Sequence, residues 1–193
     1  MRICKGMIDL NYADIKYCDV ANGKGVRVSL FVSGCTHHCT GCFNEEAWDF
    51  QYGKPFTEDT IRQIMAYLDR PYIAGLSLLG GEPFEHVNQQ GLLPLLRQVK
   101  AKFPEKNIWC YTGYDFEQDI LGWMDGEWEE TKEMLSYIDI LVDGEFVEAK
   151  KNPGLQFKGS SNQRIIEVQA SLAEGRIVLW EPEEYVHIIV KEN

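Results

Sequence analysis

Residues 26–42 read VRVSLFVSGCTHHCTGC and join a predicted strand to a cysteine-rich loop. The run 26–32 alternates and is rich in β-branched residues, which predicts a β-strand, and the Ser-Gly pair after it ends the strand. Cys35, Cys39 and Cys42 follow with the spacing C-x3-C-x2-C. Three thiols therefore converge from one loop at the end of a strand.

A second loop of unusual composition follows a second predicted strand. Residues 73–83 read IAGLSLLGGEP. The nearly continuous apolar run 73–79 is typical of a strand that is covered on both faces, and the Gly-Gly-Glu-Pro loop at 80–83 follows it directly. Each of the two unusual loops thus begins where a strand ends.

The remaining periodicity predicts an α/β fold. It indicates four further elements: a helix capped by Thr57 and ending before Pro71, a helix over 91–103 with Pro94 in its first turn, and strands at 108–111 and 138–142. Alternating strands and helices are typical of a parallel sheet, whose carboxyl ends collect ligand-binding groups. Because a complete eight-stranded barrel needs about 250 residues, we expect a partial barrel or an open, mainly parallel sheet.

Length and composition fit one globular domain. The chain has 193 residues, of which 45% are hydrophobic and 12% aromatic, enough for a packed core. We therefore predict a single domain over 1–193, with its core at about 20–168. Further β-like runs at 163–168 and 177–190 predict that the chain either completes the sheet there or forms an edge hairpin, and we expect 169–193 to be a C-terminal β-like extension.

Charge and hydropathy exclude some functions. The formal net charge of −11 repels a phosphate backbone, so we expect no direct binding to nucleic acid. The sequence contains neither a signal-like apolar run nor the ~18 apolar residues of a membrane span, which predicts a cytoplasmic protein without a membrane partner. In a reducing compartment, clustered thiols are metal ligands or catalysts rather than disulfide partners.

The cysteine triplet predicts a metal site, and two kinds of site remain open. An iron–sulfur cubane held by three cysteines keeps one iron free for an outside ligand. Zinc is the alternative and would need a fourth ligand, either His37 or His38, from the same short loop. The scattered Cys4, Cys18 and Cys110 are interpreted as ordinary cysteines without a ligand role.

The C-x3-C-x2-C loop, followed about forty residues later by Gly-Gly-Glu-Pro after the next strand, resembles the radical S-adenosylmethionine superfamily. The resemblance implies that Cys35, Cys39 and Cys42 carry a [4Fe–4S] cluster whose fourth iron is chelated by S-adenosylmethionine. Reductive cleavage of that cofactor would give a 5′-deoxyadenosyl radical, which abstracts a hydrogen atom. The cofactors would carry this chemistry, so no side chain is expected to act as a catalytic acid or base.

Other segments resemble a narrower family, the anaerobic ribonucleoside-triphosphate reductase activating proteins. The resemblance covers roughly residues 8 to 168 and rests on the segments NGKGVR at 22–27, CFN at 42–44, YTGY at 111–114, LVDGEF at 141–146 and GSSNQR at 159–164. It implies a short partial (βα) barrel and an oxidoreductase that generates a glycyl radical on the large subunit of the anaerobic reductase. A reduced flavodoxin or ferredoxin would supply the electron.

The resemblance also assigns cofactor-binding residues. Gly41, Cys42 and Phe43 would lie beside the adenine end of S-adenosylmethionine, and Thr112 and Gly113 on its ribose side. The methionine end would lie beside three residues of the second loop: Gly80, Gly81 and Glu82. Four polar residues have simpler interpretations: Glu82 as a loop stabiliser, Asp143 as a turn former, and His86 and His187 as ordinary surface or packed histidines.

Three functional alternatives follow from these observations. The chain could instead activate another glycyl-radical enzyme such as formate C-acetyltransferase, act as a radical enzyme on a small metabolite, or be a zinc-stabilised binding module. Residues 115–148 carry twelve acidic residues and one lysine, so the acidity of the chain is local. That stretch is either a solvated face or a docking surface for a partner.

Overall fold

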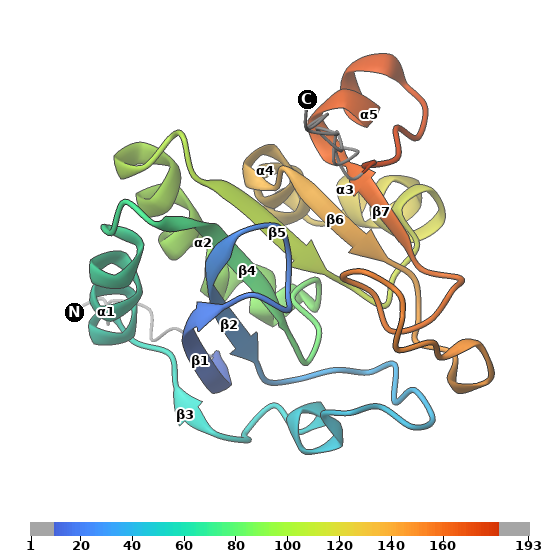
Figure 1. The fold of residues 1–193 in the computed structure, drawn as a ribbon, viewed down its shortest axis with the longest axis horizontal. Coiled ribbons are helices and arrows are strands. Elements are labelled where there is room, and N and C mark those ends of the chain that lie inside the picture. The colour runs from blue at the N-terminus through green and yellow to red at the C-terminus, as the bar shows by residue number, and fades with distance from the viewer. Residues whose placement is uncertain (1–9, 182–193) are drawn as a thin grey trace, which may run out of the picture.

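The structure is a computed structural model that describes residues 10–181. Its strands form one seven-stranded sheet in the order β3-β1-β2-β4-β5-β6-β7 (Figure 1). The strands are β1 (Asn11–Asp19), β2 (Val26–Val32), β3 (Lys54–Pro55), β4 (Ile73–Gly80), β5 (Asn107–Tyr111), β6 (Ile140–Asp143) and β7 (Arg164–Glu167). The predicted strands at 26–32, 73–79, 108–111 and 138–142 are thus confirmed as β2, β4, β5 and β6, with small shifts at their ends.

The α/β class is confirmed, and the sheet is mixed. β2, β4, β5 and β6 run parallel to one another at its centre, whereas β1, β3 and β7 are antiparallel to their neighbours. β7 completes the sheet, as its β-like sequence predicts. The finer expectation, that this sheet forms a partial barrel, stays a prediction.

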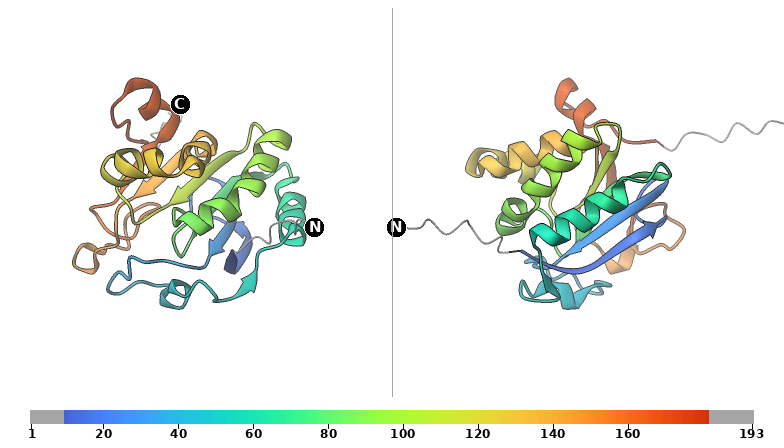
Figure 2. Two further views of the ribbon diagram at one scale, coloured as in Figure 1. Left: turned by 180° about the vertical axis from the view of Figure 1, so that it is seen from behind. Right: turned by 90° about the vertical axis from the view of Figure 1, so that its left-hand side faces the viewer.

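Helices cover one face of the sheet (Figure 2). The helices of the fold are α1 (Glu58–Leu68), α2 (His86–Lys102), α3 (Asp125–Glu127), α4 (Glu129–Tyr137) and α5 (Val168–Glu174), with a π-helical segment, Phe116–Met124, after β5. Short 3-10 turns at Glu45–Trp48 and Glu148–Lys150 lie in loops outside this helical layer. None of the helices within the described range is long and apolar enough to cross a bilayer.

Alternation along the strands separates two apolar clusters. In β5, Ile108 and Cys110 point into the large core between the sheet and the helices. Trp109 and Tyr111 point to the opposite face, where they join a smaller cluster with Phe157. Because successive side chains of a strand point to opposite faces, one β5 strand serves both the core and the open face.

Helix α2 begins earlier than predicted. The prediction placed it at 91–103, but it starts at His86, so Pro94 lies inside the helix rather than in its first turn. The polar residues before the predicted start are buried: Asn88 and Gln89 donate side-chain hydrogen bonds to loop carbonyls. Their polarity therefore reflects contacts with neighbouring loops and not exposure in a loop of their own.

The prediction of a β-like extension over 169–193 is wrong for 169–174, which form a helix, and is confirmed at 178–180, which pair with β7. Residues of high helix propensity form α5, and Gly175 ends this helix in a left-handed conformation with φ 62°. The chain then returns to the sheet edge, where Leu179 forms a bridge with Ile166. The rest of the predicted β-like run, from residue 182 on, lies outside the described residues.

Candidate functional site

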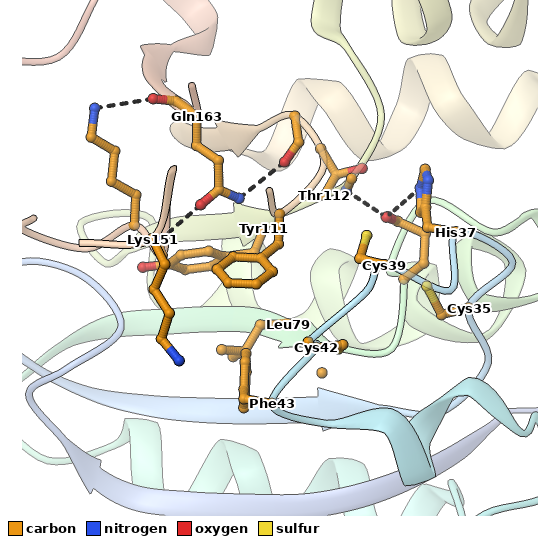
Figure 3. A pocket seen from close by; sticks show the side chains of 18 of the residues that line it. Cys35, His37, Cys39, Cys42, Phe43, Leu79, Tyr111, Thr112, Lys151 and Gln163 are labelled. Carbon is orange, nitrogen blue, oxygen red and sulfur yellow. Dashed lines mark hydrogen bonds and ion pairs between the residues drawn. The ribbon is translucent and has the colours of Figure 1, made fainter. Parts of the chain in front are cut away.

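A cavity of about 420 Å³ opens where the parallel strands β2, β4 and β5 end (Figure 3). It is lined by every residue that the sequence predicts to bind a metal or a cofactor. These residues are Cys35, Cys39, Gly41, Cys42, Phe43, Gly80, Gly81, Glu82, Thr112 and Gly113. Three loops that are distant in the sequence thus meet at one edge of the sheet, as the carboxyl-end rule for α/β folds requires.

The cysteine loop is anchored where it leaves β2. The backbone N–H of Gly34 donates to the carbonyl of Ala47 at 2.8 Å, and that of Cys35 donates to Trp48 at 3.2 Å. Cys35 is buried, and the other two cysteines of the loop are partly exposed. Burial, and then the charge of Glu82, raise the pKa of the Cys35 thiol to about 12. A metal centre bound here would have to displace this proton, which couples its binding to pH.

The spacing of the sulfur atoms bears on the zinc alternative. Within residues 10–181, the three thiols do not all lie within 4.8 Å of one another, alone or with a histidine. Tetrahedral zinc with Zn–S bonds of about 2.3 Å would need sulfurs about 3.8 Å apart. His38 stacks on Trp48, with ring centroids 4.7 Å apart. Three widely spaced cysteine ligands on one loop fit a multinuclear cluster better than a single zinc ion.

The glycine pair at 80–81 lets two loops touch. A Cβ on Gly80, whose φ is +110°, would lie 2.7 Å from the backbone of Phe31 and Val32. A Cβ on Gly81 would lie 2.5 Å from the carbonyl oxygen of Gly34. The sequence suggests close approach to a ligand as the reason for these glycines. The structure adds a second reason, the packing of this loop directly against β2 and the cysteine loop.

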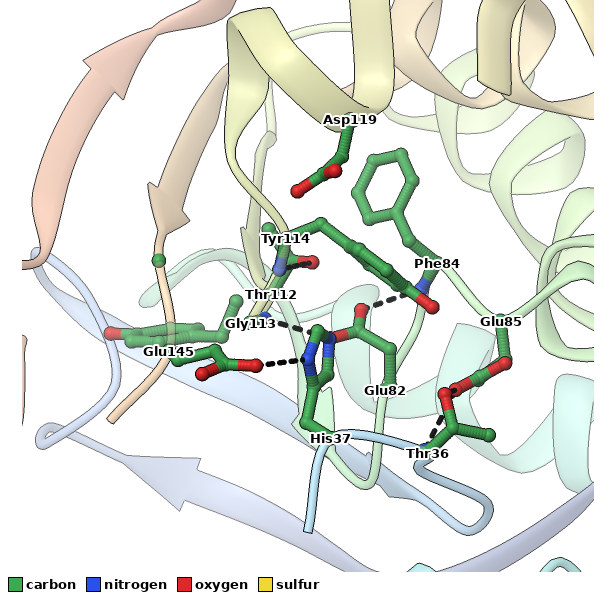
Figure 4. Close-up of polar contacts among 12 residues, drawn as sticks. Thr36, His37, Glu82, Phe84, Glu85, Thr112, Gly113, Tyr114, Asp119 and Glu145 are labelled. Atoms are coloured by element: carbon green, nitrogen blue, oxygen red, sulfur yellow. Dashed lines mark hydrogen bonds and ion pairs between the residues drawn. The ribbon is translucent and has the colours of Figure 1, made fainter. Parts of the chain in front are cut away.

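Glu82 ties the loops together. Its side chain is 1% exposed, and its two oxygens accept hydrogen bonds from the backbone N–H groups of Phe84, at 2.8 Å, and Gly113, at 2.7 Å (Figure 4). One of these oxygens also lies 3.2 Å from Nε2 of His37. The contacts match the loop-stabilising interpretation of Glu82. Binding of a cofactor by its carboxylate stays a prediction.

His37 links the cysteine loop to a fourth segment. Its Nδ1 lies 3.0 Å from the carboxylate of Glu145, and its ring packs edge-on against Tyr114. Burial alone would lower the pKa of His37, but the carboxylates of Glu82 and Glu145 outweigh it and raise the pKa from 6.5 to about 9. Both ring nitrogens face carboxylates, so His37 holds loops together in this arrangement and is not oriented as a zinc ligand. From the sequence alone, His37 is considered only as a possible zinc ligand.

Residues 144–163, which we name the strap, connect β6 to β7 and cover the open face of the sheet. The strap packs on the cysteine loop at Gly41, where φ is +74° and a Cβ would lie 2.9 Å from the Glu148 carboxyl carbon. At the end of the strap, the side-chain oxygen of Gln163 accepts hydrogen bonds from the backbone N–H groups of Gly159 and Ser160. The polar run at 160–163 therefore forms a turn.

Sequence reasoning misses several lining residues. Six strap residues outside the predicted motifs line the cavity: Lys151, Asn152, Pro153, Leu155, Phe157 and Lys158. Tyr111 also lines it; this residue lies in the YTGY segment but is not among the predicted cofactor-binding residues. The signal available for them is weak: aromatic and aliphatic residues within a basic, polar loop. Periodicity cannot reveal them, because the strap has little regular structure.

Asp143 does not line the cavity. It is 1% exposed, accepts a hydrogen bond from the N–H of Phe116 at 3.0 Å and pairs with Arg164. Arg164 also pairs with Asp115 and Glu117, the other members of the acidic cluster around Asp143. This guanidinium offsets part of the charge of the three carboxylates, which agrees with a structural role for Asp143.

Comparisons with known proteins agree with this site. A family model described as a 4Fe-4S single cluster domain matches residues 21–166, which indicates an iron–sulfur cluster. A protein of Enterobacteria phage T4 is 42% identical over 156 residues, which cover 81% of this chain and 93% of the relative. Relatives from Haemophilus influenzae (40% over 158 residues, 81% and 97%) and Escherichia coli K12 (38% over 156 residues, 80% and 96%) are similar. All three are named anaerobic ribonucleoside-triphosphate reductase-activating protein, and this chain belongs to their family.

Proposed function

We propose that the chain is a radical S-adenosylmethionine enzyme that generates a glycyl radical on the anaerobic ribonucleoside-triphosphate reductase. The observation that carries the proposal is the convergence of the C-x3-C-x2-C loop and the Gly-Gly-Glu-Pro loop in one cavity of a chain of this family. We propose further that the sheet is a partial barrel, that 1–193 is one domain, and that the protein works in the cytoplasm.

Cys35, Cys39 and Cys42 would hold a [4Fe–4S] cluster, and the wide spacing of their sulfurs supports this fit. When bound, the cluster and S-adenosylmethionine would supply an electron and a 5′-deoxyadenosyl radical, which takes a hydrogen atom from a glycine Cα of the reductase. The N–H of Asn44 donates to the sulfur of Cys42 at 3.4 Å. Such a donor stabilises a thiolate and tunes the potential of a cluster bound to it.

The chain's own residues would position the cofactor. Gly41 and Phe43 would flank the adenine, and Thr112 and Gly113 the ribose, as the resemblance implies. Glu82 fixes the Gly113 turn by its hydrogen bond, so we expect it to orient the ribose side through the backbone. A carboxylate that accepts two backbone N–H groups is held rigidly, which suits a site that must hold a reactive species in one geometry.

The strap would shield the site from water. It packs on the cysteine loop through Glu148 and Glu145 and lies over the open face of the sheet. Exclusion of water protects a radical intermediate from side reactions. The cavity remains open on one side, which supports a substrate presented by another protein. A reduced flavodoxin or ferredoxin would donate the electron.

The test uses protein reconstituted anaerobically with iron and sulfide. Given S-adenosylmethionine and a reductant, it should form 5′-deoxyadenosine, and addition of the reductase should produce the doublet of a glycyl radical in the EPR spectrum. Cys39→Ala should lose both signals. Cys18→Ala, which removes an exposed thiol outside the cavity, should keep them.

Two outcomes would reject parts of the proposal. A loaded protein that cleaves S-adenosylmethionine but forms a glycyl radical only on another enzyme, such as formate C-acetyltransferase, would change the substrate. Zinc in the purified protein, with no cluster spectrum after reconstitution, would remove the radical mechanism altogether.

A further inference from the structure

The two ends of the cavity differ in charge. Glu82 is the one acidic side chain among the described residues that line it, and it lies at the cysteine end. At the other end the strap contributes Lys151 and Lys158, and Figure 3 shows Lys151 remote from Cys35, with Tyr111 between them. Residues 149–163 contain three lysines and no acidic residue, although the chain as a whole carries a formal charge of −11.

The lysines at this outer end can still form ion pairs and hydrogen bonds with a partner. Within residues 10–181, neither Lys151 nor Lys158 forms an ion pair; Lys158 donates to the carbonyl of Gln163 at 3.0 Å, and Lys151 is exposed. An ammonium group has three donors, so Lys158 keeps two for another acceptor. Two cations beside a cavity without a facing carboxylate give this end a positive potential.

A buried hydroxyl at the same end also lacks a partner. The Tyr111 hydroxyl is buried and makes no hydrogen bond in the described structure, although Tyr111 lines the cavity. Leaving such a group unsatisfied is unfavourable, and a ligand with an acceptor atom would remove this cost. Leu155 and Phe157 line the same end and add apolar surface.

We propose that this outer end of the cavity binds an acidic segment of the protein substrate. The lysines would pair with its carboxylates, the apolar strap residues would contact its side chains, and Tyr111 would donate a hydrogen bond to its backbone. The inference rests on the proposed function, which requires a polypeptide to reach the cavity. The carboxylate of S-adenosylmethionine does not explain the lysines, because the resemblance puts that group on the cluster, at the other end.

The experiment measures binding, so that it does not depend on turnover. Two fluorescent twelve-residue peptides share a central glycine deuterated at Cα and differ only in two glutamates against two glutamines. Their dissociation constants are measured by anisotropy with reconstituted protein and S-adenosylmethionine, without reductant. The wild type should bind the glutamate peptide about 5- to 10-fold more tightly at low salt, and about 0.3 M salt should remove most of the difference because these pairs are exposed.

Substitutions at three positions test the residues. Lys151→Gln should lower the preference for the glutamate peptide by about 2- to 5-fold and Lys151→Arg should restore it, whereas Lys54→Gln, on the exposed β3 edge, should change nothing. Tyr111→Phe should weaken both peptides by a similar factor of about 3–10, the loss of one hydrogen bond. The affinity for S-adenosylmethionine should stay unchanged in all three.

Equal binding of the two peptides by the wild type would overturn the inference. So would a loss of charge preference in Lys54→Gln, or a weaker affinity for S-adenosylmethionine in Lys151→Gln, which would assign the lysine to the cofactor. Addition of reductant then tests the proposed function separately: deuterium from the glycine should appear in 5′-deoxyadenosine. Charge-dependent binding without deuterium transfer, and without a glycyl radical on the reductase, would reject the function and leave the binding surface standing.

Discussion

Replacing Glu82 by glutamine tests whether this side chain holds the site together. The carboxylate is buried and accepts two short backbone hydrogen bonds, from Phe84 and Gly113, beside the ring of His37. Glutamine has nearly the same shape but offers only one acceptor oxygen. Its amide NH₂ would face one of the two N–H groups, which would then be buried without a partner.

The magnitude follows from these contacts. A hydrogen bond to a charged group is worth about 1.5–3 kcal/mol, and an unsatisfied buried N–H adds a cost of about 1–3 kcal/mol. We therefore expect Glu82→Gln to lower the free energy of unfolding by about 3 kcal/mol. In a chain of this length, that corresponds to a fall in Tm of about 6–12 °C.

The measurement is urea and thermal unfolding of the cluster-free, fully reduced protein, followed by circular dichroism. Glu145→Gln is the matched control, since its side chain is 58% exposed and contacts the same histidine from the other side. An exposed pair of this kind contributes less than about 1 kcal/mol. If Glu82→Gln unfolds within about 1 kcal/mol of the wild type, or if the control loses as much, Glu82 does not hold the loops.

Two further substitutions probe the frame of the site. Arg27→Met should lower the free energy of unfolding by at least about 3 kcal/mol in urea unfolding. The buried guanidinium donates to Ser77, Asn107 and backbone carbonyls, which methionine would leave unpaired. A loss below about 1 kcal/mol would contradict this role. Gly81→Ala should lower both Tm and the iron content after reconstitution, because its Cβ would clash with the Gly34 carbonyl. Gly126→Ala is the control: its Cβ would meet nothing within 4 Å, so it should be neutral or slightly stabilising. Equal effects of the two substitutions would refute the packing argument.

The sequence predicts the residues that line the site better than it predicts the residues that hold the two loops in place. Strong local patterns identify β2 and β4 and the two loops after them, and the rule for parallel sheets then brings the loops together. The contacts that fix those loops come from polar residues whose partners are distant. Asn88 bonds to carbonyls at the base of both loops, yet in the sequence it belongs to a polar run that suggests no helix. Tertiary hydrogen bonding of this kind leaves no local pattern.

The acidic stretch 115–148 shows that the sequence does not reveal which charged residues pair with one another either. By sequence it is a docking candidate, but most of its carboxylates contact basic side chains from outside the stretch. These side chains come from α2, from β7 and from the cysteine loop: His86 with Glu130, Arg97 with Glu133, Lys100 with Asp139, Arg164 with Asp115, Glu117 and Asp143, and His37 with Glu145.

Two of these contacts, His86 with Glu130 and Arg97 with Glu133, join α2 to α4, so the excess of negative charge serves the packing of the helical layer as well as its solvation. Some carboxylates have no such partner among the described residues; of these, Asp125 and Glu127 lie at α3, away from the cavity, whereas Glu148 lies in the strap against Gly41. A partner attracted to Asp125 and Glu127 would not be led to the cysteine loop. The cationic strap, at the mouth of the cavity, is better placed to select a substrate, because charge affects recognition most where the reacting segment must enter.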